Sequence, residues 1–291
     1  MLTFADVFEA LTKFRLETAS AVITEAAVDS RQVIPGSLFI AIQGEHVDGH
    51  NYVSEAFSRG AGFALVERDA PGGWQTLDLR HGTATNLQAV SLESPMCLRV
   101  ENSLLALQQI ARFWRSKLNI RVIGITGSVG KSTTKEAVAD VLGTRYSTLK
   151  NLGNMNNEIG LPLTILRLGP GYEYAVLEMG FYVPGEIALL CEIASPQVGV
   201  VTNIGTVHAS RAGSKDTIYK GKSELIQALP EAGTAILNHD DPYVWKMAGL
   251  TKAQVFSYGL DPSSNLWADE VEGLGLDGIR FNLHHRSESM H

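Results

Sequence analysis

A glycine-rich turn in the middle of the chain has the residue types that hold phosphate groups. It spans Gly124–Thr133, follows the apolar run Arg121–Ile123 and opens a helix-like segment. In such a turn backbone N–H groups point inward, and the start of the helix adds partial positive charge. Lys131 can reach the outer phosphates, and Ser132 can place its hydroxyl on Mg²⁺. The turn therefore predicts nucleotide binding, although a glycine turn at this place can also serve only as a tight connection.

The spacing of the glycines departs from the common phosphate-binding pattern. That pattern has a glycine at the position of Ile125, whereas here the glycines are Gly124, Gly127 and Gly130. The lysine and the hydroxyl residue directly after the last glycine favour phosphate binding over a plain turn. The residues predicted to hold the nucleotide are Thr126, Gly127, Ser128, Val129, Gly130, Lys131, Ser132 and Thr133.

Three further residues could complete a metal and phosphate site with this turn. Glu178 follows the apolar run Tyr174–Leu177, where a carboxylate can hold Mg²⁺, but it could also be a helix cap or a solvated acid. His208 comes just past the run Val201–Val207, and a lone histidine is usually structural or exposed. Lys222 lies on a predicted helix. On spacing alone, a solvated charge is the favoured interpretation of Lys222.

Alternating apolar runs and helical patterns, from about Glu101 onwards, would bring these residues to one place. The predicted strands are residues 122–125, 174–177, 198–202 and 234–237. Such alternation predicts a parallel sheet covered by helices on both faces. Ligands of open sheets of this kind bind at the carboxyl ends of the strands, so polar residues just past those ends are expected to meet. Asp277 and Gly278 predict a late β-hairpin.

The first hundred residues predict a smaller α/β unit. Thr3 and Asp6 indicate the start of an amphipathic helix. Its apolar face is predicted to comprise Phe4, Val7, Phe8, Leu11 and Phe14. Residues 38–42 and 63–66 are predicted strands, with a helix near residues 52–58 between them.

Residues 69–95 lack a clear periodicity and predict an irregular segment. A helix over residues 104–117 with Asn102 as its cap follows. We therefore expect two domains, residues 1–98 and residues 99–291. The predicted fold class is α/β, with a small N-terminal domain and a central phosphate-loop domain built on a mainly parallel sheet.

Bulk composition narrows the class of protein. The chain has 291 residues, 45% of them hydrophobic, and a formal net charge of −7. A polyanion partner generally needs a basic face, so nucleic acid is not an expected partner. The start of the chain lacks a basic leader and no apolar run is long enough to span a bilayer, so we expect a cytoplasmic protein without a membrane partner. Cys97 and Cys191 predict two buried, reduced thiols.

Beyond bare spacing, Thr126–Thr133 resembles the phosphate loop of the Mur ligase family, the ATP-dependent amide-bond-forming enzymes that build the peptidoglycan precursor. The segments that resemble the MurF type within this family are Thr134–Glu136, Gly153–Thr164, Glu178–Gly180 and Pro184–Ile187. The segments that resemble the domain holding the UDP end of the precursor are Asp29–Arg31, Gly36–Phe39, Gly44–Glu45 and Asp48–His50. The resemblance runs from about Val28 to Asp241, apart from the irregular segment.

The resemblance implies roles for matching residues in the central domain. Lys131 would be the phosphate lysine, and Ser132 and Glu178 would be ligands of one Mg²⁺. His208 would hold a second Mg²⁺. Lys222 matches the lysine that the family carbamylates, which turns an ammonium into an oxygen donor for Mg²⁺. Lys131, His208 and Lys222 are thus the implied catalytic residues.

The resemblance also implies residues that contact the substrate. Asp29, Ser30 and Arg31 would contact the UDP-sugar, with a buried structural pair of Arg31 and Asp29 as the alternative. Asn154, Asn156 and Asn157 would line the loop beside the phosphates, but asparagines in a glycine-rich turn are just as often turn formers.

The implied activity is ATP-dependent addition of D-alanyl-D-alanine to UDP-N-acetylmuramoyl-tripeptide through an acyl phosphate, by a monomer. Val129 and Ser132 replace the asparagine and threonine usual in the MurF type. No counterpart of the family's C-terminal domain precedes His291, so we expect this polypeptide alone to bind nucleotide or precursor with little turnover. The alternatives are another Mur-like ligase, of the MurE or cyanophycin type, and a nucleotide-binding protein without catalysis.

Overall fold

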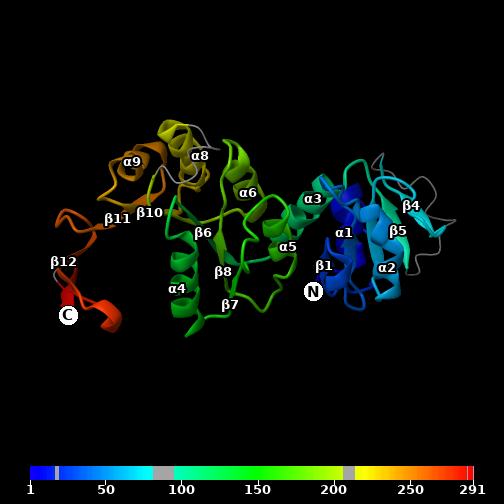
Figure 1. The fold of residues 1–291 in the computed structure, drawn as a ribbon, viewed down its shortest axis with the longest axis horizontal. Coiled ribbons are helices and arrows are strands. Elements are labelled where there is room, and N and C mark those ends of the chain that lie inside the picture. The colour runs from blue at the N-terminus through cyan, green and yellow to red at the C-terminus, as the bar shows by residue number, and fades with distance from the viewer. Residues whose placement is uncertain (17–19, 81–94, 206–213, 287, 291) are drawn as a thin grey trace. The chain divides into compact units, whose positions relative to one another are not determined.

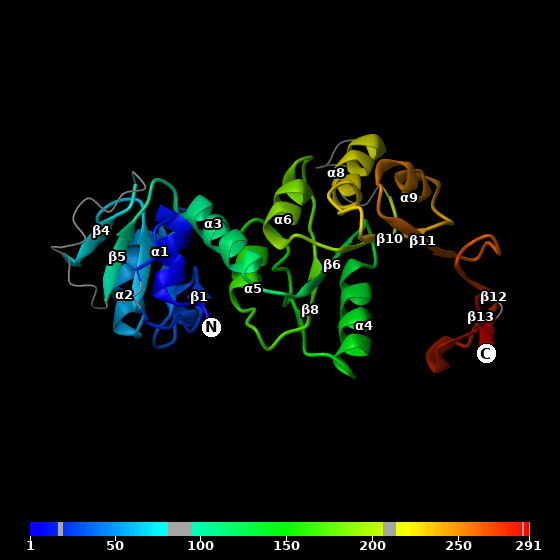
Figure 2. The same cartoon turned by 180° about the vertical axis from the view of Figure 1, so that it is seen from behind.

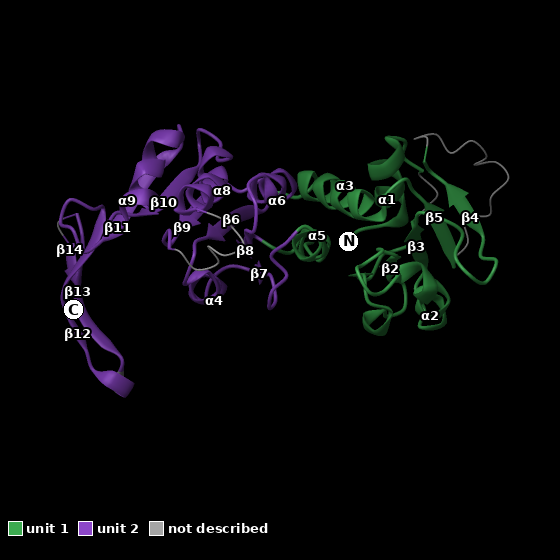
Figure 3. Ribbon diagram, turned by 45° about the horizontal axis from the view of Figure 1, so that its top comes forward, with its two compact units in different colours: residues 1–119, 158–172 green, residues 120–157, 173–291 purple. Residues whose placement is uncertain are grey.

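The computed structural model describes residues 1–16, 20–80, 95–205, 214–286 and 288–290. The chain forms two compact units (Figure 3). Unit 1 comprises residues 1–119 and 158–172, and unit 2 comprises residues 120–157 and 173–291. The segment 158–172 therefore belongs to unit 1, although it lies between two parts of unit 2 in the sequence. The domain boundary between residues 98 and 99 stays a prediction.

Unit 1 contains a five-stranded parallel sheet in the order β1–β2–β3–β5–β4. Strands β4 and β5 of this sheet lie side by side in Figure 1. Its strands are β1 (Ala26–Ala27), β2 (Leu38–Ile40), β3 (Phe63–Val66), β4 (Thr76–Asp78) and β5 (Met96–Arg99). Its helices are α1 (Phe4–Thr12), α2 (Val53–Ser58), α3 (Ser103–Ser116), α5 (Gly160–Leu166) and the 3₁₀ turns η1 (Ser30–Gln32) and η2 (Gly49–Tyr52). The predicted α/β unit is confirmed.

Strand β4 corrects one expectation, because it lies within residues 69–95, which the sequence predicts to be irregular. It pairs in parallel with β5 at the edge of the sheet. With only three residues, it is too short to show an alternating pattern. Residues 81–94 lie outside the described part of the chain.

Helix α1 starts as the sequence predicts but ends earlier. The Thr3 hydroxyl accepts the Asp6 N–H at 3.3 Å, and the Asp6 carboxylate accepts the Thr3 N–H at 3.0 Å, which is a capping box. Lys13 has a left-handed backbone (φ 65°) and ends the helix. Phe14 therefore lies beyond the helix and is 61% exposed. The prediction that Phe14 shares the apolar face was wrong.

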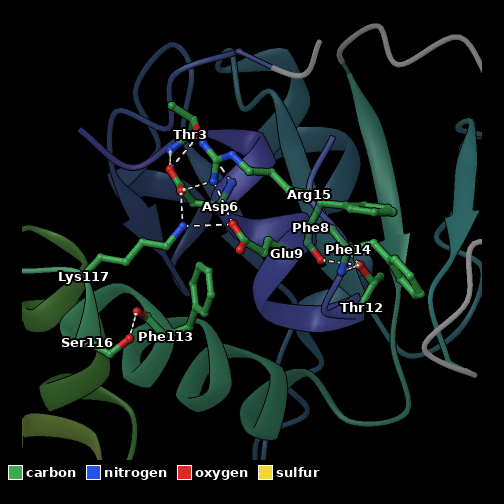
Figure 4. A network of polar contacts seen from close by, with 10 residues as sticks. All are labelled: Thr3, Asp6, Phe8, Glu9, Thr12, Phe14, Arg15, Phe113, Ser116 and Lys117. Atoms are coloured by element: carbon green, nitrogen blue, oxygen red, sulfur yellow. Dashed lines mark hydrogen bonds and ion pairs between the residues drawn. The ribbon is translucent and has the colours of Figure 1, made fainter. Parts of the chain in front are cut away.

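A polar network joins α1 to the end of α3 (Figure 4). The buried Asp6 carboxylate accepts hydrogen bonds from Lys117 at 3.0 Å and from Arg15 at 3.1 Å. Both cations also contact Glu9. Burial raises the pKa of Asp6, but the hydrogen bonds from Thr3, Lys117 and Arg15 outweigh it and lower that pKa to about 2. The network holds two helices of unit 1 together.

Unit 2 contains a nine-stranded sheet in the order β14–β13–β12–β11–β10–β9–β6–β8–β7. The strands are β6 (Arg121–Thr126), β7 (Thr148–Lys150), β8 (Tyr174–Glu178), β9 (Val198–Val201), β10 (Thr234–Asn238), β11 (Gln254–Gly259), β12 (Leu266–Gly273), β13 (Ile279–His285) and β14 (Glu288–Met290). Across the sheet from β7 to β12, each strand is parallel to its neighbour, whereas β13 pairs antiparallel with both β12 and β14. The predicted parallel sheet and late hairpin are confirmed.

The helices α4, α6, α8 and α9 of unit 2 gather around the central strands of this sheet (Figure 2). The helices of this unit are α4 (Lys131–Gly143), α6 (Glu186–Ala194), α8 (Lys215–Gln227), α9 (Pro242–Trp245) and the 3₁₀ turns η3 (Lys246–Leu250) and η4 (Gly275–Asp277). Helix α4 contacts β6, β7 and β8, and α8 contacts β6 and β9. Central strands covered in this way read as continuous apolar runs, which is why the sequence predicts them well.

Two further expectations concern single residues and membrane spans. Cys97 and Cys191 are free and buried, as predicted. Burial raises the pKa of the Cys97 thiol to about 11 and that of Cys191 to about 12, so both stay protonated at neutral pH. No helix in the described ranges combines the length and the apolar character that a membrane span needs.

Candidate functional site

The phosphate-binding turn joins the end of β6 to the start of α4. Gly130 precedes the helix with a left-handed backbone (φ 84°), so glycine suits this position. Gly127 also has a positive φ (151°), and a Cβ there would lie 1.9 Å from the Thr202 hydroxyl. The first N–H groups of a helix have no intrahelical acceptor and form an anion site. The turn therefore has the geometry that the sequence predicts.

Glu178 is the last residue of β8, and its carboxylate is buried beside this turn. One carboxylate oxygen accepts the Ser132 hydroxyl at 2.7 Å, and the other accepts the side-chain N–H of Asn156 at 2.8 Å. Glu178 is 4% exposed, so it is not a solvated acid. The two residues predicted to share a Mg²⁺ are in direct contact. A hydroxyl and a carboxylate oxygen are hard donors of the kind that Mg²⁺ takes together with substrate phosphates.

Asn151 fixes Glu178, and sequence reasoning missed it. Its side chain accepts the Glu178 N–H at 3.0 Å and donates to the Glu178 carbonyl at 3.0 Å. Asn151 is fully buried, and its own carbonyl accepts the buried Lys135 ammonium at 2.8 Å. The available signal was its place directly after β7, which is the strand that pairs with β8. It is a polar residue just past a strand end, beside Glu178 at the end of β8.

Lys222 is buried, so the interpretation from spacing alone, a solvated charge, was wrong. It lies on α8, is 4% exposed and donates to the Gly127 carbonyl at 2.9 Å. Burial and the nearby charge of Lys131 lower the pKa of Lys222 to about 7, although Glu178 opposes the shift. The Phe181 ring lies 5.1 Å from the Lys222 nitrogen. An amine in this setting is largely neutral at slightly alkaline pH.

Lys131 is the second cation at this site. It is half-buried, and its ammonium lies 3.5 Å from the Ser128 carbonyl. Burial lowers the pKa of Lys131, and the negative charge of Glu178 opposes that shift. Two lysines thus face one buried carboxylate, which makes the site receptive to further negative charge.

A cavity of about 350 Å³ lies between these groups, entirely within unit 2. Its lining residues are Gly127, Ser128, Lys131, Asn154, Asn156, Asn157, Glu178, Gly180, Phe181, Tyr182, Ile218 and Lys222. The structure therefore brings Lys131, Glu178 and Lys222 together with residues 154–157, called here the asparagine segment. The other predicted loop residues belong to the same turn but are not among the lining residues of this cavity; they are Thr126, Val129, Gly130, Ser132 and Thr133. His208 lies outside the described residues.

A second cavity, of about 660 Å³, lies within unit 1 and contains the predicted UDP-sugar contacts Asp29, Ser30 and Arg31 among its lining residues. The Arg31 guanidinium donates to both oxygens of Asp29, at 2.9 and 2.7 Å. The two residues pair, but the Arg31 side chain is 79% exposed, unlike a buried structural pair. Ser30 donates to Glu55 at 3.1 Å. Their contacts with substrate stay predictions.

Among the residues that the structure describes, the acidic side chains do not gather into a ready-made metal site. In the described ranges, no group of three or more His, Cys, Asp or Glu side chains is placed to hold an ion. Mg²⁺ sites that include substrate phosphates use one or two carboxylates, so Ser132 with Glu178 fits such a site. The donor chemistry thus suits a metal that arrives with a nucleotide.

Comparisons with known proteins found matching family models and relatives. One family model that matches, described as the Mur ligase middle domain, covers residues 125–290, and a second, described as the catalytic domain of the Mur ligase family, covers residues 22–115. The UDP-N-acetylmuramoyl-tripeptide–D-alanyl-D-alanine ligase of Bacillus subtilis is 41% identical over 262 residues, which are 90% of this chain and 52% of that protein. The Synechocystis ligase of the same name is 36% identical over 262 residues, 90% and 54% of the two chains.

Solved structures give the same result. MurF from Acinetobacter baumannii superposes with a TM-score of 0.80 at 30% identity and covers 98% of this chain, which corresponds to 59% of that protein. MurF from Thermotoga maritima, in complex with ADP, superposes with a TM-score of 0.77 at 29% identity, over 97% of this chain and 58% of that protein. The chain spans about half the length of the curated relatives it matches.

Proposed function

The chain belongs to the Mur ligase family, and from this premise we propose that it is the ATP- and precursor-binding part of a ligase that joins D-alanyl-D-alanine to UDP-N-acetylmuramoyl-tripeptide. The observation that carries the proposal is the contact between Ser132 and Glu178 beside two lysines. This arrangement suits a triphosphate with its metal, because the oxygens can bind the metal while the lysines face the phosphates. The relatives' names supply the substrate pair.

In the proposed reaction, the terminal carboxylate of the tripeptide attacks the γ-phosphorus of ATP, and ADP leaves. The resulting acyl phosphate is attacked by the amine of D-alanyl-D-alanine, which loses a proton as phosphate departs. Lys131 contacts the outer phosphates and offsets the charge that builds up during transfer. Glu178 and Ser132 would hold the metal ion that accompanies the phosphates. No side chain forms a covalent bond with substrate.

The metal and the modified lysine belong to the same proposal. Bound Mg²⁺ supplies charge compensation for the β- and γ-phosphates. The buried neutral amine of Lys222 would bond to the carbon of CO₂ and lose a proton to solvent, which gives a carbamate with an anionic oxygen near Glu178. Its lowered pKa supports this, because only a neutral amine takes up CO₂. We also propose His208 as a ligand of a second Mg²⁺, and a monomer that acts in the cytoplasm without nucleic-acid or membrane partners.

Calorimetric titration of the 291-residue chain with ATP tests the proposal, with and without Mg²⁺. We expect binding that needs Mg²⁺ and is lost in Lys131→Ala, because the phosphates lose their main cation. Lys135→Ala is unsuitable as a control because Lys135 supports Asn151, so the exposed Lys220→Ala serves instead. A folded chain that ignores Mg·ATP, or a Lys131→Ala variant that binds it normally, would overturn the proposal.

The choice of amine acceptor separates the ligase types. Release of phosphate by the whole ligase should depend on D-alanyl-D-alanine and on UDP-N-acetylmuramoyl-tripeptide. Dependence on a different amino acid would point to a MurE or cyanophycin type. Binding of ATP without any response to UDP-sugar peptides would favour a non-catalytic protein.

A further inference from the structure

Residues 126–129 of the phosphate-binding turn are held by the residues that follow β9. Thr202 donates its hydroxyl to the Val129 carbonyl at 2.7 Å and its N–H to the Thr126 carbonyl at 3.0 Å. The Asn203 carbonyl accepts the Ser128 N–H at 2.9 Å. The two segments are more than 70 residues apart in the sequence. The turn is therefore fixed by a second strand end and not by β6 and α4 alone.

The side chain of Asn203 forms hydrogen bonds with both the N–H and the carbonyl of Val129. The carboxamide oxygen accepts the Val129 N–H at 3.0 Å, and the carboxamide nitrogen donates to the Val129 carbonyl at 3.0 Å. Only an amide side chain offers a neutral donor and acceptor side by side in this way. The Val129 side chain is 55% exposed. Hydrogen bonds to the backbone, and not packing of the side chain, hold this residue in place.

These two hydrogen bonds set the direction of the peptide groups on either side of Val129. In a trans peptide the C=O and the N–H point in opposite directions. Because the Val129 carbonyl points towards Asn203, the Gly130 N–H of the same peptide points to the opposite side. In the preceding peptide the Val129 N–H is held by Asn203, and the Ser128 carbonyl points away from it, 3.5 Å from the Lys131 ammonium. A flipped peptide at this place would instead present a carbonyl oxygen to the phosphates.

The N–H groups of Ser128 and Val129 already have protein acceptors, so they are not the ones that a phosphate meets. The N–H groups of residues 130–133 precede the first intrahelical hydrogen bond of α4. We propose that Asn203 is a positioning residue of the phosphate-binding turn: by holding Val129 at both backbone groups, it keeps the N–H groups of residues 130–133 directed at the outer phosphates of a nucleoside triphosphate. The inference rests on the proposed function, which supplies that ligand, and Asn203 acts through Val129.

Two measurements on the 291-residue chain test this role. Hydrogen exchange of the ligand-free protein follows the Val129 N–H, and calorimetry follows Mg·ATP. In Asn203→Ala both side-chain hydrogen bonds to Val129 are lost, and the Val129 N–H loses its acceptor while Thr202 still donates to the Val129 carbonyl. We therefore expect exchange at Val129 to be about five- to tenfold faster and Mg·ATP to bind about five- to tenfold more weakly. Asn203→Asp keeps the acceptor for the Val129 N–H but loses the donor. It should restore slow exchange at Val129 while binding stays weak.

Asn265→Ala is the matched control, because Asn265 also accepts a backbone N–H from another segment, that of Ser257 at 2.8 Å, away from the phosphate turn. It should leave Mg·ATP binding unchanged. Wild-type affinity in Asn203→Ala would overturn the inference, and so would weaker binding with unchanged exchange at Val129. If the wild-type chain binds no Mg·ATP, the proposed function fails. The exchange experiment alone then decides whether Asn203 holds the Val129 N–H. If Asn203→Ala does not fold, Asn203→Asp carries both measurements, and wild-type affinity for Mg·ATP or fast exchange at Val129 in that variant would overturn the inference.

Discussion

At the scale of single residues, Lys222 owes its chemistry to burial and not to its sequence neighbours. The same side chain on an exposed helix face would be an ordinary cation. Here desolvation and the charge of Lys131 act in the same direction and bring its pKa to about 7. Glu178 acts against them. The balance leaves an amine that is both reactive and close to a carboxylate.

This balance predicts a carbamate whose amount depends on pH. With a pKa of about 7, the amine is roughly nine-tenths neutral at pH 8, whereas a solvated lysine is almost entirely charged there. We expect a carbamate signal with ¹³C-bicarbonate in carbon NMR that grows from pH 6 to pH 8 and vanishes in Lys222→Met. The exposed Lys220→Met should leave it unchanged. A signal that survives Lys222→Met would remove the carbamate from the proposed site.

Sequence reasoning found the parts of the site that have a local signature. The turn from Gly127 to Ser132 and the strand ending at Glu178 could be read from glycine spacing and apolar runs. Lys222 could not, because its burial depends on how α8 packs on β6 and β9. Asn151 and Asn203 were missed for the same reason: each acts on a backbone group far away in the sequence. Only the family resemblance recovered Lys222.

At the scale of elements, α8 packs so closely beside the cavity that one glycine has no room for a side chain. A Cβ on Gly221 would lie 1.8 Å from an atom of the Phe181 ring. Phe181 in turn covers Lys222. The contact therefore links the position of α8 to the exclusion of water from the amine.

We expect Gly221→Ala to cost about 1–3 kcal/mol of stability, because the ring or the helix has to move. Gly143→Ala, also in a helix of unit 2 but with open space around its Cα, is the matched control and should be neutral or slightly stabilising. Urea titrations of both variants measure the difference. Equal stability of the two variants would mean that Phe181 moves aside freely.

In unit 1, the network around Asp6 predicts stability that depends on pH. The pKa of Asp6 falls from 3.8 to about 2 on folding, which corresponds to about 2 kcal/mol at neutral pH. Because the folded pKa is the lower one, this stabilisation is complete above about pH 4 and is lost as the pH falls towards 2. Asp6→Asn should therefore destabilise the protein at pH 7 and by about half as much at pH 3, in urea titrations at both values. Glu9→Gln, at the more exposed acid of the same network, should cost less. A constant effect of Asp6→Asn across this range would show that its charge is not what stabilises α1.

At the scale of the whole molecule, the two proposed ligand cavities belong to different units. Each cavity is lined by residues of one unit only, the proposed nucleotide cavity by unit 2 and the proposed UDP-sugar cavity by unit 1. The chain nevertheless passes between the units at residues 157 and 158, directly after the asparagine segment, and places α5 in unit 1. Sequence position is therefore a poor guide to which ligand a segment responds to.

Hydrogen exchange across the whole chain tests this separation. A ligand at one hundred times its Kd stabilises the unit that binds it by about 2.7 kcal/mol, so exchange that requires opening of that unit slows about a hundredfold. With Mg·ATP we expect this protection in β6, α4 and β8 and not in β2 or β3, and Lys131→Ala should abolish it. Helix α5 is the decisive segment. Although it lies in sequence between two parts of unit 2, it should follow unit 1 and respond to a UDP-sugar peptide, because it packs on α3. If α5 became protected with Mg·ATP to the same degree as α4, the two units would not be independent binding bodies, and the assignment of one ligand to each cavity would fail.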